Sequence, residues 1–180
     1  MNVRLISTLL VVLAGSVVIT FSRLPAEMQT RAVSAPQVGF VAPGFAGNLA
    51  NGGTLTQQQL TNTPVVLNFW ASWCPPCRAE MPALQKMSDR YAPAGVRFIS
   101  VNSTVQDDPS AALAFLAQNN ITFDTVMDQD GSITRAYLVN SLPSTFFIAP
   151  NGKVSAVVIG GPISEASLIG NIERMLQEQP

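Results

Sequence analysis

Two cysteines, Cys74 and Cys77, are the residues of this chain best suited to chemistry, and two prolines separate them. They follow a nearly continuous apolar run, 65–70, and precede a segment with helical apolar spacing, so a buried strand turns into a helix here. A spacing of three puts both sulfurs within one helical turn, close enough to form a small disulfide ring. The unpaired amides and the positive end of the dipole at a helix N-terminus favour a thiolate there. We therefore predict that Cys74 is the nucleophile and Cys77 the resolving thiol.

Other roles for the cysteine pair fit less well. A structural disulfide that closes so small a loop would constrain the unfolded chain little. Two thiolates without a histidine make a poor metal site, so no metal ligand is predicted. Two merely buried cysteines would leave their spacing and placement without a reason.

Composition excludes several further kinds of chemistry. The chain has 180 residues, two cysteines, no histidine and a net charge of −1. Without histidine, Ser-His-Asp and Cys-His catalysis, histidine metal sites and haem attachment through C-x-x-C-H are excluded. Two cysteines are too few for a four-cysteine zinc or iron–sulfur site within one chain. The slightly acidic balance argues against nucleic acid as a partner, because such binding needs a basic patch.

The elements that must position the cysteines alternate along the body of the chain. Apolar and β-branched runs predict strands at 65–70, 96–101, 123–127, 145–149 and 154–159, and helical spacing or caps predict helices at 75–91, 109–120, 132–137 and after Ser164. Asn51-Gly52 predicts an N-terminal hairpin, and Pro150-Asn151-Gly152 predicts a closing one. Strand–helix alternation implies parallel pairing and the hairpins imply antiparallel pairing. We therefore predict an α/β fold, a mixed central sheet with helices on both faces.

An apolar segment precedes this body. Residues 5–21 carry no charge, and Arg4 and Arg23 flank them. As a helix they would span about 25 Å, slightly less than a hydrocarbon core of about 30 Å. We predict a signal anchor or transmembrane helix at 1–22, a linker at 23–37 and one domain at 38–180. The alternative is a cleaved signal peptide, with Val33-Ser34-Ala35 as the best cleavage site.

The segment around the cysteines resembles the active site of the thioredoxin superfamily, most closely the membrane-tethered extracytoplasmic group typified by TlpA and ResA. The resemblance covers roughly residues 38–178. Gly39 and four stretches carry it: Asn68-Phe69-Trp70-Ala71-Ser72-Trp73-Cys74-Pro75-Pro76-Cys77-Arg78-Ala79-Glu80-Met81-Pro82, Leu142-Pro143-Ser144-Thr145-Phe146-Phe147-Ile148, Asn151-Gly152-Lys153-Val154 and Ala42-Pro43-Gly44-Phe45. It implies a thioredoxin-like fold with an N-terminal β-hairpin addition.

The resemblance also implies roles for residues outside the pair. Pro143 matches the family's cis-proline, and Leu142 before it would offer its backbone to an extended substrate strand. Trp73, Pro75 and Pro76 complete the expected substrate-binding set.

A third acid-base group is expected at Glu80. It lies about 60° around the helix from Cys77 and matches the acid of the ResA-like group. Thioredoxins often place a buried aspartate where this chain has Asn68, which cannot take a proton. Glu80 is therefore the predicted proton-transfer group, and a solvated helix surface is the alternative place for it.

The function that the resemblance implies is reduction of disulfides in other proteins, outside the cytoplasmic membrane and held there by the N-terminal helix. Several members of the group reduce apocytochrome c, which makes it a candidate substrate, and a membrane thiol carrier of the CcdA or DsbD type recharges them. No separate cofactor is expected, because the Cys74–Cys77 pair itself carries the electrons. The alternatives are a thiol peroxidase on the same fold and a copper or haem chaperone that uses the two thiolates.

Overall fold

The computed structural model of the chain describes residues 34–178. The predicted anchor, 1–22, and most of the predicted linker lie outside these residues. Among the described residues, no helix combines the length and the apolar character needed to cross a bilayer.

Strands and helices alternate as the sequence predicts. The strands are β1 (Ala46–Leu49), β2 (Thr54–Thr56), β3 (Val65–Trp70), β4 (Arg97–Asn102), β5 (Asp124–Met127), β6 (Ser144–Ile148) and β7 (Val154–Ile159). The helices are α2 (Pro75–Tyr91), α3 (Pro109–Gln118), α4 (Ser132–Ala136) and α5 (Glu165–Gln177), with 3-10 turns η2 (Gln57–Leu60), η3 (Ala92–Ala94) and η4 (Thr104–Gln106). The predicted bounds of these strands and helices agree with the structure to within two residues, and those of 65–70, 75–91 and 154–159 are identical.

Seven strands form one mixed sheet in the order β2-β1-β5-β4-β3-β6-β7. The centre is parallel, β3 with β4 and β4 with β5, whereas β6 and β7 run antiparallel to their neighbours. The N-terminal hairpin, β1 and β2, adds to the sheet beyond β5 through an antiparallel pairing. The predicted mixed sheet and the predicted hairpin addition are both confirmed.

The central strand β3 is buried on both faces of the sheet. Its nearly continuous apolar run allows this, because a strand that is covered on both sides needs apolar side chains on both. Its side chains alternate. Val66 and Trp70 join the hydrophobic cluster that contains both cysteines, and Val65, Leu67 and Phe69 join the cluster on the opposite face. Asn68, between Val66 and Trp70 in this alternation, faces the cysteine side.

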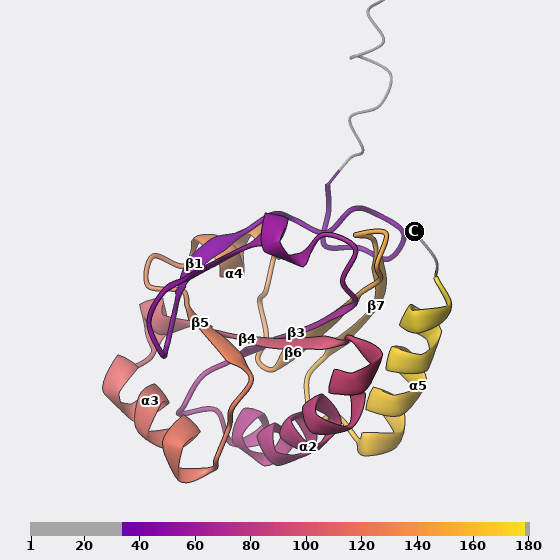
Figure 1. Ribbon diagram of the computed structural model, residues 1–180. Coiled ribbons are helices and arrows are strands. Elements are labelled where there is room, and N and C mark those ends of the chain that lie inside the picture. The colour runs from indigo at the N-terminus through magenta and orange to yellow at the C-terminus, as the bar shows by residue number, and fades with distance from the viewer. Residues whose placement is uncertain (1–33, 179–180) are drawn as a thin grey trace, which may run out of the picture. The chain divides into compact units, whose positions relative to one another are not determined.

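Helices cover both faces of the sheet. The cluster that contains the cysteines is built from α2, α3 and α5, which lie together on one side of the sheet (Figure 1). On the other face, α4, η2 and the segment before β1 contribute Ile133, Leu60, Ala42 and Phe45. The cysteine pair therefore lies at the start of α2, shortly after β3, a strand whose six residues are all buried.

Candidate active site

Cys74 and Cys77 form a disulfide at the N-terminus of α2. Their sulfurs are 2.00 Å apart and their Cα atoms 5.3 Å apart. Cys74 is the N-cap residue of α2, and its sulfur accepts a hydrogen bond from the backbone N–H of Cys77 at 3.3 Å. This donor is one of the amides that the first turn of a helix leaves unpaired. The Cys74 sulfur is thus placed where an N–H group and the helix dipole stabilise a negative charge.

The segment that leads into Cys74 is braced by a loop after β4. The Asp107 carboxylate accepts hydrogen bonds from the backbone N–H and the hydroxyl of Ser72, both at 2.6 Å, and from Asn102 Nδ2 at 2.7 Å. The indole Nε1 of Trp73 donates to the carbonyl of Gln106 at 2.9 Å. The two residues just before Cys74, Ser72 and Trp73, are therefore both held by hydrogen bonds to this loop.

Glu80 lies one turn along α2 and is buried, with 1% of its surface exposed. Its Oε1 accepts from Asn68 Nδ2 at 2.8 Å, and its Oε2 accepts from the backbone N–H of Ile163 at 2.9 Å. Burial raises the pKa of Glu80 above its ordinary value, and the hydrogen bonds from Ile163 and Asn68 oppose that rise. The alternative expectation, that Glu80 lies on a solvated helix surface, is therefore wrong, because α2 turns this side chain toward the sheet.

Pro143 and Glu80 meet at the backbone of Gly161. A Cβ atom on Gly161 would lie 2.5 Å from Pro143 Cγ and 2.6 Å from Glu80 Oε2. The N–H of Gly160 donates to the carbonyl of Pro143 at 2.8 Å, and the Leu142–Pro143 peptide bond is cis, as the resemblance implies. The loop 160–163 therefore contacts both Pro143 and Glu80.

The other predicted substrate-binding residues differ in exposure. Trp73 is 56% exposed and Pro75 is exposed, whereas Pro76 and Leu142 are half-buried and Pro143 is buried. Exposed and half-buried apolar groups beside a buried disulfide are a surface that a polypeptide can contact.

Sequence reasoning missed the residues that contact Glu80 and Ser72 from afar. Asp107, Gly161 and Ile163 lie 30 or more residues from Cys77 in the sequence, and no local spacing connects them with the motif. The one available signal was the Gly160-Gly161-Pro162 run directly after a predicted strand, because glycine there permits a close backbone approach.

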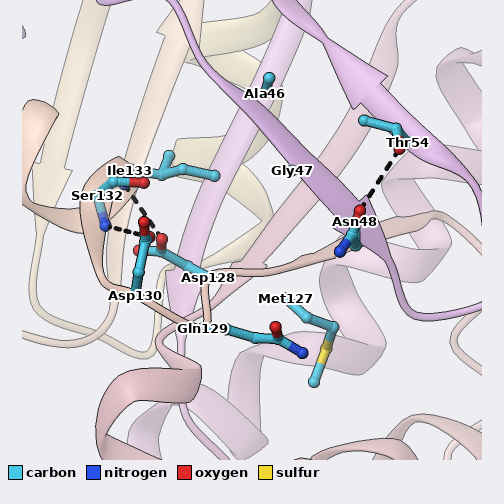
Figure 2. A pocket seen from close by; sticks show the side chains of 10 residues that line it. All are labelled: Ala46, Gly47, Asn48, Thr54, Met127, Asp128, Gln129, Asp130, Ser132 and Ile133. Atoms are coloured by element: carbon cyan, nitrogen blue, oxygen red, sulfur yellow. Dashed lines mark hydrogen bonds between the residues drawn. The ribbon is translucent and has the colours of Figure 1, made fainter.

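A separate pocket of about 350 Å³ lies beside α4 and holds neither cysteine. Its lining residues are Ala46, Gly47, Asn48, Thr54, Met127, Asp128, Gln129, Asp130, Ser132 and Ile133 (Figure 2). Its two carboxylates are used by the fold. Asp128 accepts from the N–H groups of Ile133 and Thr134, and Asp130 accepts from that of Ser132. Within residues 34–178, no group of three or more Cys, His, Asp or Glu side chains is placed to hold a metal ion.

Comparison with known proteins identifies the family. The AhpC/TSA family model matches residues 38–157, more than half of the chain. The chain belongs to the AhpC/TSA family. The thiol-disulfide oxidoreductase ResA of Bacillus subtilis is 36% identical over 122 residues, which are 68% of this chain and 67% of ResA.

Two solved structures extend the comparison for this AhpC/TSA family member. A candidate thiol:disulfide interchange protein DsbE from Chlorobium tepidum is 33% identical with a TM-score of 0.71, over 78% of this chain and 98% of that one. A secreted Mycobacterium tuberculosis disulfide oxidoreductase, homologous to E. coli DsbE, is 27% identical with a TM-score of 0.66, over 72% and 94%. With the Cys74–Cys77 disulfide at the start of α2, these likenesses identify a thiol-disulfide oxidoreductase of the ResA and DsbE type.

Proposed function

We propose that the protein reduces disulfides in other proteins, with Cys74 as nucleophile, Cys77 as resolving thiol and Glu80 as proton acceptor. The observation that carries this proposal is the arrangement on α2. The Cys74 sulfur accepts a hydrogen bond from the backbone N–H of Cys77, and the buried Glu80 carboxyl group lies three residues beyond Cys77. Dithiol chemistry has two requirements: a thiolate that attacks the substrate, and a base that takes the proton of the resolving thiol.

The reaction has two exchange steps. The Cys74 thiolate attacks one sulfur of a substrate disulfide, forms a mixed disulfide and releases the other substrate sulfur as a thiolate. Cys77 then loses its proton to Glu80 and attacks the Cys74 sulfur, which forms the Cys74–Cys77 disulfide and releases the second substrate thiolate. The substrate gains two electrons, the protein loses two, and the proton stays on Glu80. A membrane thiol carrier of the CcdA or DsbD type restores the dithiol.

We further propose that the catalytic domain works outside the cytoplasmic membrane, attached by residues 1–22 as a single-pass anchor. The apolar segment 5–21 supports an anchor, and the secreted relative from Mycobacterium tuberculosis supports an oxidising compartment. Apocytochrome c is the candidate substrate, because its C-x-x-C pair must be reduced before haem attaches.

The direct test is a single turnover of the purified, reduced full chain with a peptide that contains an oxidised C-x-x-C-H segment. We expect one peptide disulfide to be reduced for each protein, and none by Cys74→Ser. A protein that leaves the peptide oxidised, or that oxidises the reduced peptide instead, would contradict the proposal.

Two further arms separate the alternative functions. A thiol peroxidase would consume hydrogen peroxide with excess thiol at a rate that depends on Cys74, and we expect no such consumption above the uncatalysed rate. A copper or haem chaperone would retain its metal after anaerobic purification of the dithiol form, and we expect none.

A further inference from the structure

The buried amide of Asn68 connects Glu80 with the strand that follows Pro143. Asn68 lies on β3 and is 2% exposed. Its Nδ2 donates to Glu80 Oε1 at 2.8 Å and to Thr145 Oγ1 at 2.9 Å, and Thr145 is its register partner on β6. Both hydrogens of this amide nitrogen are therefore used, one of them on the predicted proton acceptor.

Both oxygens of Glu80 face hydrogen-bond donors. Asn68 Nδ2 approaches Oε1, and the Ile163 N–H approaches Oε2. An ionised carboxylate only accepts hydrogen bonds, whereas a neutral acid must also donate one. Two donors and no carbonyl acceptor among these partners match the ionised form.

The orientation of the Asn68 amide points the same way. Asn68 Oδ1 is buried and accepts no hydrogen bond from the residues that the structure describes. Beside a neutral acid, the amide would gain from turning Oδ1 toward the acid hydroxyl and the Thr145 hydroxyl, which would pair its oxygen. The observed orientation leaves the oxygen unpaired and directs the donor at Glu80, and a hydrogen bond to a charged acceptor is the stronger kind.

Neutral groups set the charge state of Glu80. Asn68 of β3, Thr145 of β6, and Gly161 and Ile163 of the 160–163 loop carry no charge. The other titratable groups at the start of α2 are Cys74, Cys77 and Arg78, and the Arg78 guanidinium lies over the Phe115 ring, 5.1 Å from its centroid. Burial raises the pKa of Glu80, whereas the hydrogen bonds from Ile163 and Asn68 lower it. No charged side chain among residues 34–178 is a cause of the shift.

We propose that Asn68 is a positioning residue that holds the buried carboxyl group of Glu80 in its ionised form, ready to take the proton of Cys77. This inference rests on the proposed role of Glu80 as proton acceptor. Asn68 touches neither sulfur in this role. It acts through Glu80, and the second hydrogen of its amide nitrogen is bonded to Thr145 Oγ1.

The first test is a carboxyl ¹³C NMR titration of Glu80 in the oxidised full chain, whose cysteines do not titrate. Glu80→Gln identifies the Glu80 resonance by its loss. In Asn68→Leu, a change of similar size without a donor, we expect the midpoint to rise by about one pH unit. An unchanged or lower midpoint overturns the proposal.

The second test follows the reaction itself by stopped flow, with the reduced full chain and 5,5′-dithiobis(2-nitrobenzoate). The first thiolate is released by Cys74 and the second by the attack of Cys77 on the mixed disulfide. The second phase should slow as the pH falls through the Glu80 midpoint. At that pH, Asn68→Leu should be about fivefold slower than the wild type, since a midpoint one unit higher leaves about one carboxyl in eleven ionised instead of one in two.

Thr145→Val is the matched control, because it removes the other partner of the same amide nitrogen and leaves the Asn68–Glu80 hydrogen bond in place. We expect its acid limb to move less than half as far as that of Asn68→Leu. An equal shift would mean that any lost hydrogen bond near Asn68 has the same effect, and would overturn the specific role.

The two proposals fail in different ways. If Glu80→Gln keeps the wild-type pH profile of the second phase, Glu80 is not the proton acceptor, whatever Asn68 does. If Glu80→Gln abolishes the acid limb but Asn68→Leu leaves it in place, only the role of Asn68 is wrong. Should Asn68→Leu not fold, the side-chain amide resonances of wild-type Asn68 still decide. They must titrate with the Glu80 midpoint and stop doing so in Glu80→Gln, and an amide signal that is independent of Glu80 overturns the inference.

Discussion

The backbone of Gly161 lies directly against the carboxyl group of Glu80, so close that a Cβ atom there would be 2.6 Å from Oε2. Two residues further on, the N–H of Ile163 donates to the same oxygen. The loop after β7 therefore closes over a carboxyl group that belongs to α2. The loop helps to cover Glu80. Burial raises the pKa of this carboxyl group, and the hydrogen bond from Ile163 opposes that rise.

Gly161→Ala should destabilise the protein and disturb Glu80. The new methyl group would press on Glu80 Oε2 and on Pro143 Cγ, and overpacking of this kind costs about 1–3 kcal/mol. Urea unfolding of the oxidised protein measures the loss. Gly170→Ala is the matched control, since a Cβ atom at this position in α5 meets nothing within 4 Å. It should stabilise the protein by about 0.5–1 kcal/mol, because alanine is the better helix former. Equal effects of the two substitutions would contradict the close packing at Gly161.

The stability of the oxidised protein should fall with rising pH in a way that depends on Glu80. Its pKa is raised in the folded state, so between the ordinary value of 4.5 and the folded value the native protein holds a proton that the unfolded chain has lost. Stability is therefore lost as the pH rises through the folded pKa. The gap between the wild type and Glu80→Gln should shift against the wild type by about 1.4 kcal/mol for each unit by which the pKa is raised. A gap that is constant from pH 4 to pH 9 in urea unfolding would contradict this.

Two adjacent aspartates should behave differently when replaced by alanine. Asp107 holds Ser72 and Asn102, whereas Asp108 caps α3 through the N–H groups of Ser110 and Ala111. Asp107→Ala should cost roughly 2–4 kcal/mol and slow the attack of Cys74, because charged hydrogen bonds to the segment before it are lost. Asp108→Ala should cost about 1 kcal/mol and leave that rate within about twofold. Thermal unfolding and the first phase of the thiolate release measure the two quantities, and a slower first phase in Asp108→Ala alone would reverse the assignment.

The order of attack can be read from trapped intermediates. Cys77→Ser should accumulate mixed disulfides with protein partners, because the resolving thiol is gone while Cys74 still attacks. Cys74→Ser should not. Non-reducing gels of cells that express each full-length variant show the products. Equal trapping by both variants would mean that the roles of the two cysteines are not distinct.

The predicted anchor can be tested in the full chain. A reporter that needs an oxidising compartment, fused after Pro180, should be active, and the protein should fractionate with membranes. Removal of residues 1–22 should abolish both the reporter activity and the fractionation with membranes. A mature chain that begins near Pro36 would instead indicate a cleaved signal peptide.

Sequence predicted what depends on local pattern. The apolar run of β3, the cap before Pro109 and the Pro150-Asn151-Gly152 turn each fix an element through its own residues, so the strands and helices lie where the pattern placed them. The cysteine pair and Glu80 share one helix, and their relative position follows from helical spacing.

The partners of these residues could not be predicted in the same way. Ile163 and Gly161 reach Glu80, and Asp107 reaches Ser72, only because β3, β4 and β7 assemble into one sheet. Asn68 was interpreted only as a residue that cannot take a proton. Its hydrogen bond to Glu80 depends on the β3 face that packs on α2, which alternation shows only once the sheet is assembled.

The central claim is that the Cys74–Cys77 pair donates electrons to other proteins, and its reduction potential tests this most directly. The potential is measured by equilibrating the purified full chain with thiol buffers of known potential and following the loss of the disulfide. The account predicts a potential more negative than about −230 mV, near the value of about −270 mV for thioredoxin. A potential near about −120 mV, as in the strong oxidant DsbA, would contradict it.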